Sequence, residues 1–257
     1  MIRRPPRSTL SSSSAASDVY KRQLLSKEKI YLNNLPKVED IKTMITLLQS
    51  LGSIIKFKKK KLLIDNSRQF KKFASYNLVK TMRAGILVLG PLLSKFGNAK
   101  VSLPGGCAIG TRPIDIHLKA LSKLGVHYKI VQGYVYASAP KGLVGSDIRF
   151  SKISVGATES AIMTAVLAKG QTKIINAAQE PEITDLANCL NKAGADIKGI
   201  GTDILVINGV KELHAVSHPV VSDRIEAGSF AIASSITMGN IEINNINPKN
   251  LKEFING

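Results

Sequence analysis

The sequence predicts an α/β fold made of repeated β-α-β-β-α-β units, each about 70 residues long. One pattern recurs three times after residue 30: a strand-like apolar run, a proline, an aspartate, an amphipathic helical stretch, a glycine and two further apolar runs. The glycines that close these helices, Gly52, Gly125 and Gly194, are spaced by 73 and then 69 residues. Such a glycine supplies the left-handed residue that ends many helices. Because one unit cannot bury its own sheet and helices, the copies must pack together.

The strands and helices predicted for each copy are given in chain order. In the first copy, strands are predicted at 30–32, 54–55 and 62–64 and a helix over 40–51. The second predicts strands at 101–103, 128–130 and 134–136 with a helix over 115–124. The third predicts strands at 174–175, 197 and 204–207 with a helix over 185–193.

A second helix is predicted late in each copy, over 78–96, 155–169 and 224–238, closed by Gly97, Gly170 and Gly239. In the middle one, Ile162, Met163, Val166 and Leu167 recur at three to four residues and mark a buried face. A fourth copy is expected to begin at 241–248, where the spacing of 174–181 returns shortly before the sequence ends.

The first 23 residues differ in composition from the remainder. They contain Arg3-Arg4-Pro5-Pro6-Arg7, a run of four serines at 11–14 and one acid, Asp18. This is typical of an organelle transit peptide, but it also fits a translated adapter, and the missing helix before residue 30 favours the adapter. We therefore expect a non-native or disordered tail over 1–23, a three-unit domain over 24–221 with a truncated first unit, and an incomplete second domain over 222–257.

The formal net charge is +18, which suggests an anionic partner. Nucleic acid is one candidate, but aromatic residues make up only 5% of the chain and tryptophan is absent, so stacking platforms are expected to be scarce. The basic run 56–61 is expected at a hairpin tip. No apolar run reaches the ~18 residues of a membrane span. Two cysteines with no zinc-ligand spacing favour a reducing, cytoplasmic setting.

The glycine-rich segment 104–113, which carries Cys107 and Arg112, is the main candidate for chemistry. From strand to proline the second copy uses twelve residues, whereas the third and fourth use seven. Insertions on a repeated scaffold often carry function, and a thiolate is favoured near positive charge. The alternative is a glycine-rich turn with an incidental cysteine.

Several ordered motifs resemble the UDP-N-acetylglucosamine 1-carboxyvinyltransferase branch of the enolpyruvyl transferase family. The resemblance runs from about residue 24 to the C-terminus. The motifs that carry it are Lys80-Thr81-Met82-Arg83-Ala84, the segment 102–110 followed by Arg112-Pro113 and Asp115, the segment 152–159, Glu180-Pro181-Glu182-Ile183, Gly201-Thr202-Asp203 and Asp223-Arg224-Ile225-Glu226.

The resemblance implies an inside-out α/β barrel with three units around a pseudo-threefold axis, and an active site between two such domains. It implies transfer of enolpyruvyl from phosphoenolpyruvate to the 3-hydroxyl of UDP-N-acetylglucosamine, the first committed step of peptidoglycan synthesis. No cofactor, metal, nucleic acid or membrane is implied, and a monomer is expected. Cys107 corresponds to the catalytic proton donor that fosfomycin alkylates. The implied substrate-binding residues are Arg83, Arg112, Pro113, Ile114, Asp115, Ile116, Lys152, Ile153, Ser154 and Val155.

Other residues receive structural interpretations. Cys189 is expected in the core and His117 in a structural role, while Glu180 and Glu182 should favour a helix dipole. Arg224 is expected near the domain boundary, and the alternative interpretation is an ion pair with Asp223 or Glu226.

The family's Lys-Asn pair near its N-terminus and its catalytic aspartate have no counterpart here, so the chain alone is expected to be impaired. Alternative hypotheses are a shikimate-3-phosphate enolpyruvyl transferase relative and a basic nucleic-acid-binding module.

Overall fold

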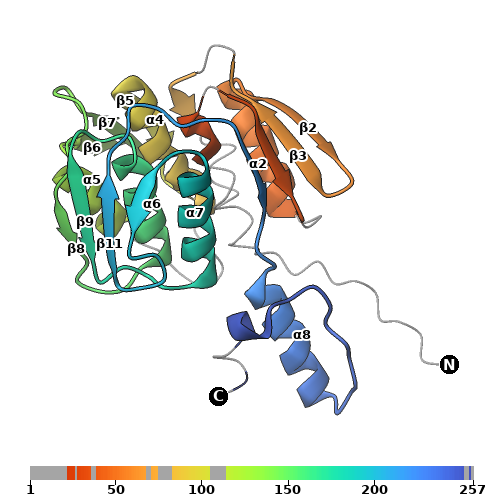
Figure 1. The fold of residues 1–257 in the computed structure, drawn as a ribbon. Coiled ribbons are helices and arrows are strands. Elements are labelled where there is room, and N and C mark those ends of the chain that lie inside the picture. The colour runs from red at the N-terminus through yellow and green to blue at the C-terminus, as the bar shows by residue number, and fades with distance from the viewer. Residues whose placement is uncertain are drawn as a thin grey trace.

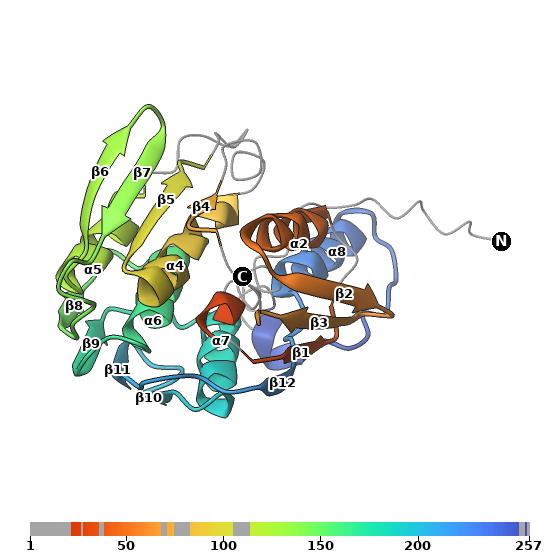
Figure 2. The same ribbon diagram turned by 90° about the horizontal axis from the view of Figure 1, so that it is seen from above.

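Three four-stranded sheets surround a bundle of helices in the computed structural model (Figures 1 and 2). The structure describes residues 22–26, 28–35, 39–67, 71–74, 83–104, 114–251 and 255. Seen from above, the sheets lie on the outside and the helices α4, α6 and α7 lie between them (Figure 2). The inside-out α/β barrel is therefore confirmed.

Each sheet has the same strand order and the same mixture of directions. A short strand pairs in parallel with a central strand, and a hairpin of two antiparallel strands completes the sheet. The sheets are β12 (Val216–Pro219), β1 (Ile30–Asn33), β3 (Lys61–Asp65) and β2 (Ile54–Lys58); β4 (Phe73–Ala74), β5 (Asn98–Ser102), β7 (Tyr134–Ser138) and β6 (His127–Val131); and β8 (Asp147–Arg149), β9 (Gln171–Ile175), β11 (Ile204–Asn208) and β10 (Asp196–Lys198).

The helices bury one continuous apolar core against the inner faces of the sheets. They are η1 (Arg22–Leu25), α2 (Glu39–Leu51), η2 (Arg83–Val88), α4 (Leu89–Phe96), α5 (Asp115–Lys123), α6 (Val155–Ala165) and α7 (Pro181–Lys192). Helix α6 packs against α4, α5 and α7, which makes it the centre of the bundle. Cys189 of α7 is completely buried, as predicted.

The ring of sheets closes through a pairing between distant parts of the chain. Strand β12 pairs in parallel with β1, and Val216 lies opposite Ile30. Asn34 reinforces the closure, because its side-chain amide donates to the carbonyl oxygen of Val220 at 2.9 Å. The third unit therefore supplies a strand to the first sheet, just as the first and second units supply β4 and β8 to the sheets that follow them.

Most predicted elements are present at their expected places, and the three helix-closing glycines Gly52, Gly125 and Gly194 all have positive φ. The short parallel strands β4, β8 and β12 were not predicted. The predicted helix over 155–169 ends at Ala165, and η2 occupies part of the predicted helix over 78–96. At the end of the third late helix Met238, with φ of 49°, is left-handed in place of Gly239.

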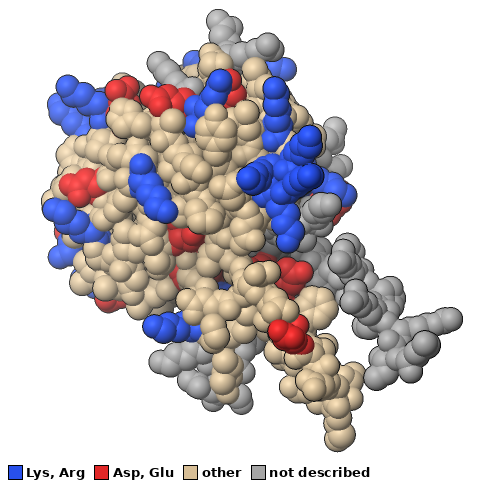
Figure 3. All heavy atoms as spheres, turned by 45° about the vertical axis from the view of Figure 1, so that its right-hand side comes forward, with Lys and Arg blue, Asp and Glu red and all other residues tan. Residues whose placement is uncertain are grey.

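Two predictions concern hairpins and strands at the surface. The basic run does form a hairpin tip, where Lys59 and Lys60 both have positive φ between β2 and β3. Basic side chains gather in a cluster on the side of the molecule that carries this hairpin (Figure 3). The fourth copy expected to begin at 241–248 does not open with a strand, since those residues form none. A strand is stable only when a sheet pairs with it, and the described residues provide no partner there.

Helix α8 (Arg224–Ile236) stands clear of the three-sheet body, together with η3 (Pro248–Leu251) (Figure 1). Its apolar side chains are largely exposed, including Ile232 at 50% and Ile236 at 77%. Among the described residues, no helix is long and apolar enough to span a membrane.

Candidate functional site

The topology brings the beginnings of several helices together. In each sheet two strands run parallel. The strands β1, β8, β9 and β12 are each followed, soon after their carboxyl ends, by α2, α6, α7 and α8. The backbone N–H groups of a helix's first turn are unpaired within the helix, and the helix dipole places a partial positive charge there. A group of such helix starts favours the binding of anions.

The starts of α5 and α6 are in direct contact. A Cβ atom placed on Gly156 would lie 2.8 Å from Nε2 of His117, so the absence of a side chain lets the imidazole approach this close. His117 is 8% exposed and lies in the first turn of α5. This contact brings the segments 114–116 and 152–155 together although about 40 residues separate them in sequence. His117 packs between the helices, and the structural role expected for it stays a prediction.

The start of α6 is in turn fixed to the segment that leads into α7. Ser154 is the N-cap of α6, and its hydroxyl accepts from the N–H of Ala157 at 3.4 Å. The hydroxyl of Thr158 donates to the carbonyl oxygen of Ser154 at 2.9 Å and accepts from the N–H of Ala178 at 3.1 Å. Thr158 is completely buried, so it is a positioning residue that sequence analysis included only as part of a motif.

The start of α7 is joined to the start of α8 by a two-fold hydrogen-bonded ion pair. The guanidinium of Arg224 donates to the Glu182 carboxylate, Nε to Oε2 at 3.1 Å and Nη2 to Oε1 at 3.0 Å. The Glu182 side chain is 3% exposed and that of Arg224 is 21% exposed. The interpretation that Arg224 pairs with Asp223 or Glu226 is therefore wrong, because the topology presents a buried carboxylate from α7 in a geometry that matches the planar guanidinium.

A second contact fixes α7 against the closing strand. Nε2 of His218 in β12 lies 2.7 Å from Oδ1 of Asp185 in α7, and both side chains are nearly buried. The two residues are 33 positions apart, and Asp185 is the aspartate of the repeated pattern. Helix α7 thus contacts the closing strand β12 through Asp185 and the first turn of α8 through Glu182.

Asp223 caps the N-terminus of α8. Its Oδ1 accepts from the N–H groups of Ile225 at 2.8 Å and Glu226 at 3.2 Å. Burial raises the pKa of the Asp223 carboxyl above its ordinary value of 3.8, and the two N–H donors oppose this rise only in part. Its Oδ2, like Oε2 of Glu180, is buried and has no hydrogen-bond partner among the described residues. Two acidic oxygens without partners therefore lie near the junction of α7 and α8.

Replacing Asp223 by asparagine should keep the cap and remove the buried charge. A raised folded-state pKa stabilises the folded protein at acidic pH, and this contribution is lost as pH rises through that pKa. Asp223→Asn should therefore match the parent near pH 4 and exceed it in stability at pH 7. Asp223→Ala should lie about 1 kcal/mol below the asparagine variant at both pH values. Urea unfolding at the two pH values measures this; an asparagine variant that is less stable than the parent at pH 7 would contradict it.

The predicted binding residues divide into three groups. Ile114, the N-cap of α5, and Ile116 are half-buried against the core, whereas Asp115 is exposed and forms a 3.6 Å ion pair with Lys119. In the second segment Lys152 and Ile153 are exposed, and Ser154 and Val155 are half-buried at the start of α6. Arg83 begins η2, and its side chain lies outside the described part. Cys107, Arg112 and Pro113 also lie outside the described residues.

The exposed end of this assembly thus offers polar backbone and a mixed set of side chains to a ligand. Ile153 is 57% exposed next to Lys152, an arrangement that suits a ligand with both apolar and anionic parts. Within the described ranges, no cluster of three or more His, Cys, Asp or Glu residues could hold a metal ion.

Comparison with known proteins places this geometry in a family. The family model described as EPSP synthase (3-phosphoshikimate 1-carboxyvinyltransferase) matches residues 22–256. The chain belongs to the EPSP synthase family. Its structure is similar to the enolpyruvyl transferase NikO from Streptomyces tendae, with a TM-score of 0.75 and 19% identity over 86% of this chain and 52% of that one. EPSP synthase from Acinetobacter baumannii matches with a TM-score of 0.69 and 16% identity, over 88% of this chain and 51% of that one.

Sequence relatives within the EPSP synthase family are much closer. A UDP-N-acetylglucosamine 1-carboxyvinyltransferase from Pelagibacter ubique (strain HTCC1062) is 59% identical over 95% of this chain and 59% of its own length. The enzyme of the same name from Acinetobacter baylyi (strain ATCC 33305 / BD413 / ADP1) is 48% identical over 94% of this chain and 58% of its own length. The chain therefore spans somewhat more than half the length of these relatives.

Proposed function

We propose that this chain belongs to an enzyme that transfers the enolpyruvyl group of phosphoenolpyruvate to the 3-hydroxyl of UDP-N-acetylglucosamine and releases phosphate. The observation that carries the proposal is the 59% identity, over 95% of this chain, to a relative named for that reaction. The aligned region is long enough to include all the candidate binding segments, also those outside the described residues.

The geometry supports the proposal through the helix starts. Both proposed sugar-nucleotide segments, 114–116 and 152–155, lie where α5 and α6 begin, and the Gly156–His117 contact brings them together. Phosphoenolpyruvate and a UDP-sugar are both anionic, and N–H groups at helix starts favour anions. Arg83 and Arg112 would add guanidinium groups, whose planar donors match phosphate and carboxylate oxygens.

The chemistry is assigned to the glycine-rich segment. Cys107 would donate a proton to the methylene carbon while the 3-hydroxyl oxygen, giving up its own proton to a base, adds to the adjacent carbon and opens the double bond. The resulting methyl group would then lose a proton as the bond from the adjacent carbon to the phosphate oxygen breaks, which restores the double bond and releases phosphate. A proton donor to carbon must be delivered close to its target and away from water, which a closing loop achieves. The same thiol would be the site of alkylation by fosfomycin.

The proposal extends to the biological setting. The reaction would be the first committed step of peptidoglycan synthesis, catalysed in the cytoplasm by a monomer that needs neither a membrane nor a nucleic acid for its chemistry. Residues 24–221 would form one domain and 222–257 the beginning of the second, with the Arg224–Glu182 pair at their junction. We expect turnover to require the part of the relatives' length that this chain does not span.

Shikimate 3-phosphate is the alternative acceptor, since it is the acceptor implied by the description of the matching family model. The solved EPSP synthase from Acinetobacter baumannii is only 16% identical, however, and identity at that level supports a shared fold alone. The alternative is therefore less well supported than the UDP-sugar.

Calorimetric titration of the chain with UDP-N-acetylglucosamine tests the proposal. Binding is expected, it should survive Cys107→Ser, and Arg112→Ala should weaken it at least about tenfold because a charge-assisted hydrogen bond contributes roughly 1.5–3 kcal/mol. The matched control is Lys42→Ala, which removes a 70% exposed cation on α2, outside the candidate binding segments, and should leave the affinity unchanged.

Two outcomes would contradict the proposal. Binding of shikimate 3-phosphate in place of the UDP-sugar would transfer the assignment to the alternative acceptor. A folded chain that binds neither ligand would mean that segments 114–116 and 152–155 do not form a sugar-nucleotide site.

A further inference from the structure

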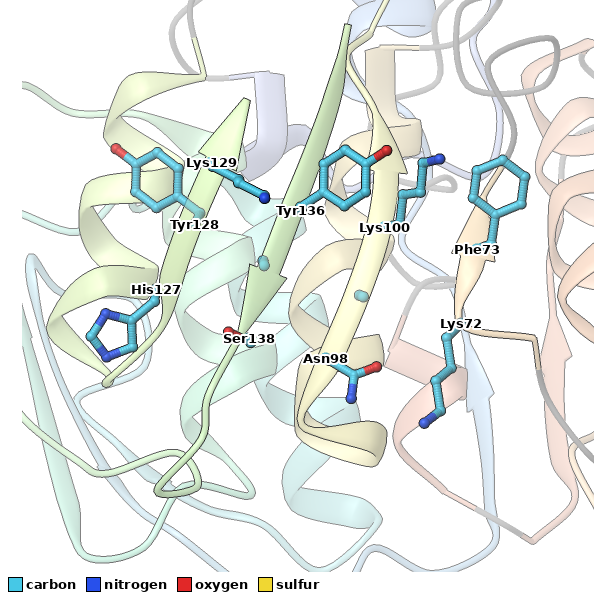
Figure 4. Close-up of a pocket in the computed structure, with 11 residues that line it drawn as sticks. Lys72, Phe73, Asn98, Lys100, His127, Tyr128, Lys129, Tyr136 and Ser138 are labelled. Atoms are coloured by element: carbon cyan, nitrogen blue, oxygen red, sulfur yellow. The ribbon is translucent and has the colours of Figure 1, made fainter. Parts of the chain in front are cut away.

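The outer face of the sheet β4–β5–β7–β6 carries a row of alternating aromatic and basic side chains. The register places Phe73 opposite Lys100, Lys100 opposite Tyr136, and Tyr136 opposite Lys129. Neighbours along each strand, such as Val101 and Val135, are buried in the core, so the row stands on the solvent side. Figure 4 shows these side chains rising from four adjacent strands.

The row is held together by cation–π contacts. Nζ of Lys100 lies 5.0 Å from the ring centroid of Phe73, 4.6 Å from Tyr134 and 4.9 Å from Tyr136. Nζ of Lys129 lies 5.8 Å from the Tyr136 centroid. These contacts fix the rings and ammonium groups in place before any ligand arrives.

A shallow hollow of about 530 Å³ lies along this row. Its basic residues are Lys72, Lys100, Lys129 and His127, and none of the residues that line it is acidic. Phe73 at its edge is 43% exposed, and Tyr134 and Tyr136 beside it are half-buried, so ring surface is accessible along the row. The hollow therefore combines positive charge with exposed aromatic surface.

The fold does not require this combination, as the other two sheets show. The equivalent row of β8–β9–β11–β10 has an aspartate and a valine where the phenylalanine and tyrosine stand, and that of β12–β1–β3–β2 has a single aromatic residue. The rows are Asp147, Lys173, Val206 and Lys198 in the first of these sheets, and Ser217, Tyr31, Leu63 and Lys56 in the second.

We propose that this sheet face binds single-stranded nucleic acid. Unpaired bases stack on aromatic side chains of a sheet, and lysines between the rings attract the phosphates. An apolar protein partner would have to desolvate three ammonium groups, and an acidic peptide would leave the ring faces unused. Low aromatic content suggested from sequence that stacking platforms are scarce, but the topology places Phe73, Tyr134 and Tyr136 together around Lys100 on one face.

This proposal is independent of the proposed catalytic function. The row lies on the outer face of a sheet, and the sheets surround the helices (Figure 2), whereas the candidate site is formed by the starts of α5 and α6. Variants of the row should leave the titration with UDP-N-acetylglucosamine unchanged.

Fluorescence anisotropy of a labelled single-stranded oligothymidylate, titrated with the chain, provides the test. Phe73→Ala and Tyr136→Ala should each weaken binding at least about fivefold, since stacking contributes roughly 1–3 kcal/mol per base. Tyr136→Phe should retain most of the affinity because it keeps the ring. Lys100→Gln should weaken binding and make its salt dependence shallower.

Matched controls on the β12–β1–β3–β2 sheet separate this site from the general positive charge. Tyr31→Ala and Lys58→Gln remove the same kinds of group there and should leave the affinity unchanged. Three results would overturn the proposal: no binding by the parent chain, equal losses in the controls, or duplex binding of equal strength that does not respond to loss of the rings. Circular dichroism of each variant verifies that it is folded.

Discussion

Replacing Arg224 by methionine is expected to lower the free energy of unfolding by about 3–5 kcal/mol, the usual cost of breaking a buried ion pair by removing one partner. Methionine keeps much of the apolar stem but leaves the Glu182 carboxylate, whose side chain is 3% exposed, without its cation. Urea unfolding, followed by circular dichroism, measures the change in midpoint and slope.

A double variant distinguishes the energy of the ion pair from the other contacts of the two side chains. The double variant Glu182→Leu/Arg224→Met removes both charges and should recover most of the loss, because buried ion pairs can be replaced by apolar residues at little cost. Their coupling follows from the double-mutant cycle. Lys42→Met breaks a pair with Glu39 in which both side chains are 70% exposed, and it should cost less than about 1 kcal/mol. If Glu226→Gln lowered the free energy of unfolding more than Arg224→Met does, Arg224 would pair with its neighbour Glu226 and not with Glu182.

Replacing Ile162 by alanine should lower stability by about 2–5 kcal/mol, the range for truncating a fully buried isoleucine. Ile162 is completely buried in α6, the helix that packs against α4, α5 and α7. The cavity would also loosen the starts of α5 and α7, so affinity for the UDP-sugar should fall with stability.

The same substitution at an exposed position is the control. Ile232 in α8 is 50% exposed, and Ile232→Ala should change the free energy of unfolding by less than about 1 kcal/mol. Equal urea midpoints for the two variants would mean that α6 is not the packed centre of the bundle.

The repeated elements could be predicted because their signals are local. A helix closed by Gly52 or Gly125 shows both its apolar period and its left-handed ending within a dozen residues. The strands β4, β8 and β12 could not be predicted, since two to four residues such as Asp147–Arg149 give no apolar run of their own. They are strands because a central strand pairs with them.

In the candidate site, too, local motifs could be predicted from sequence and distant pairings could not. Segments 114–116 and 152–155 could be chosen from motifs, and their position at helix starts agrees with that choice. The Arg224–Glu182 pair joins residues 42 positions apart, so only the assembled topology identifies the partner. The roles of Cys107 and Arg112 stay predictions, as both lie outside the described residues.

Because β12 pairs with β1, the first sheet cannot be completed during synthesis until both strands have been made. The paired residues Ile30 and Val216, like the bonded Asn34 and Val220, are 186 positions apart. At about 5–20 residues per second, the ribosome needs roughly 10–40 s to make the second strand after the first. Through that interval β1 presents an unpaired edge, a template for association with other chains. Such distant contacts also make folding slow, so a chaperone that covers β1 early should raise the yield of folded protein.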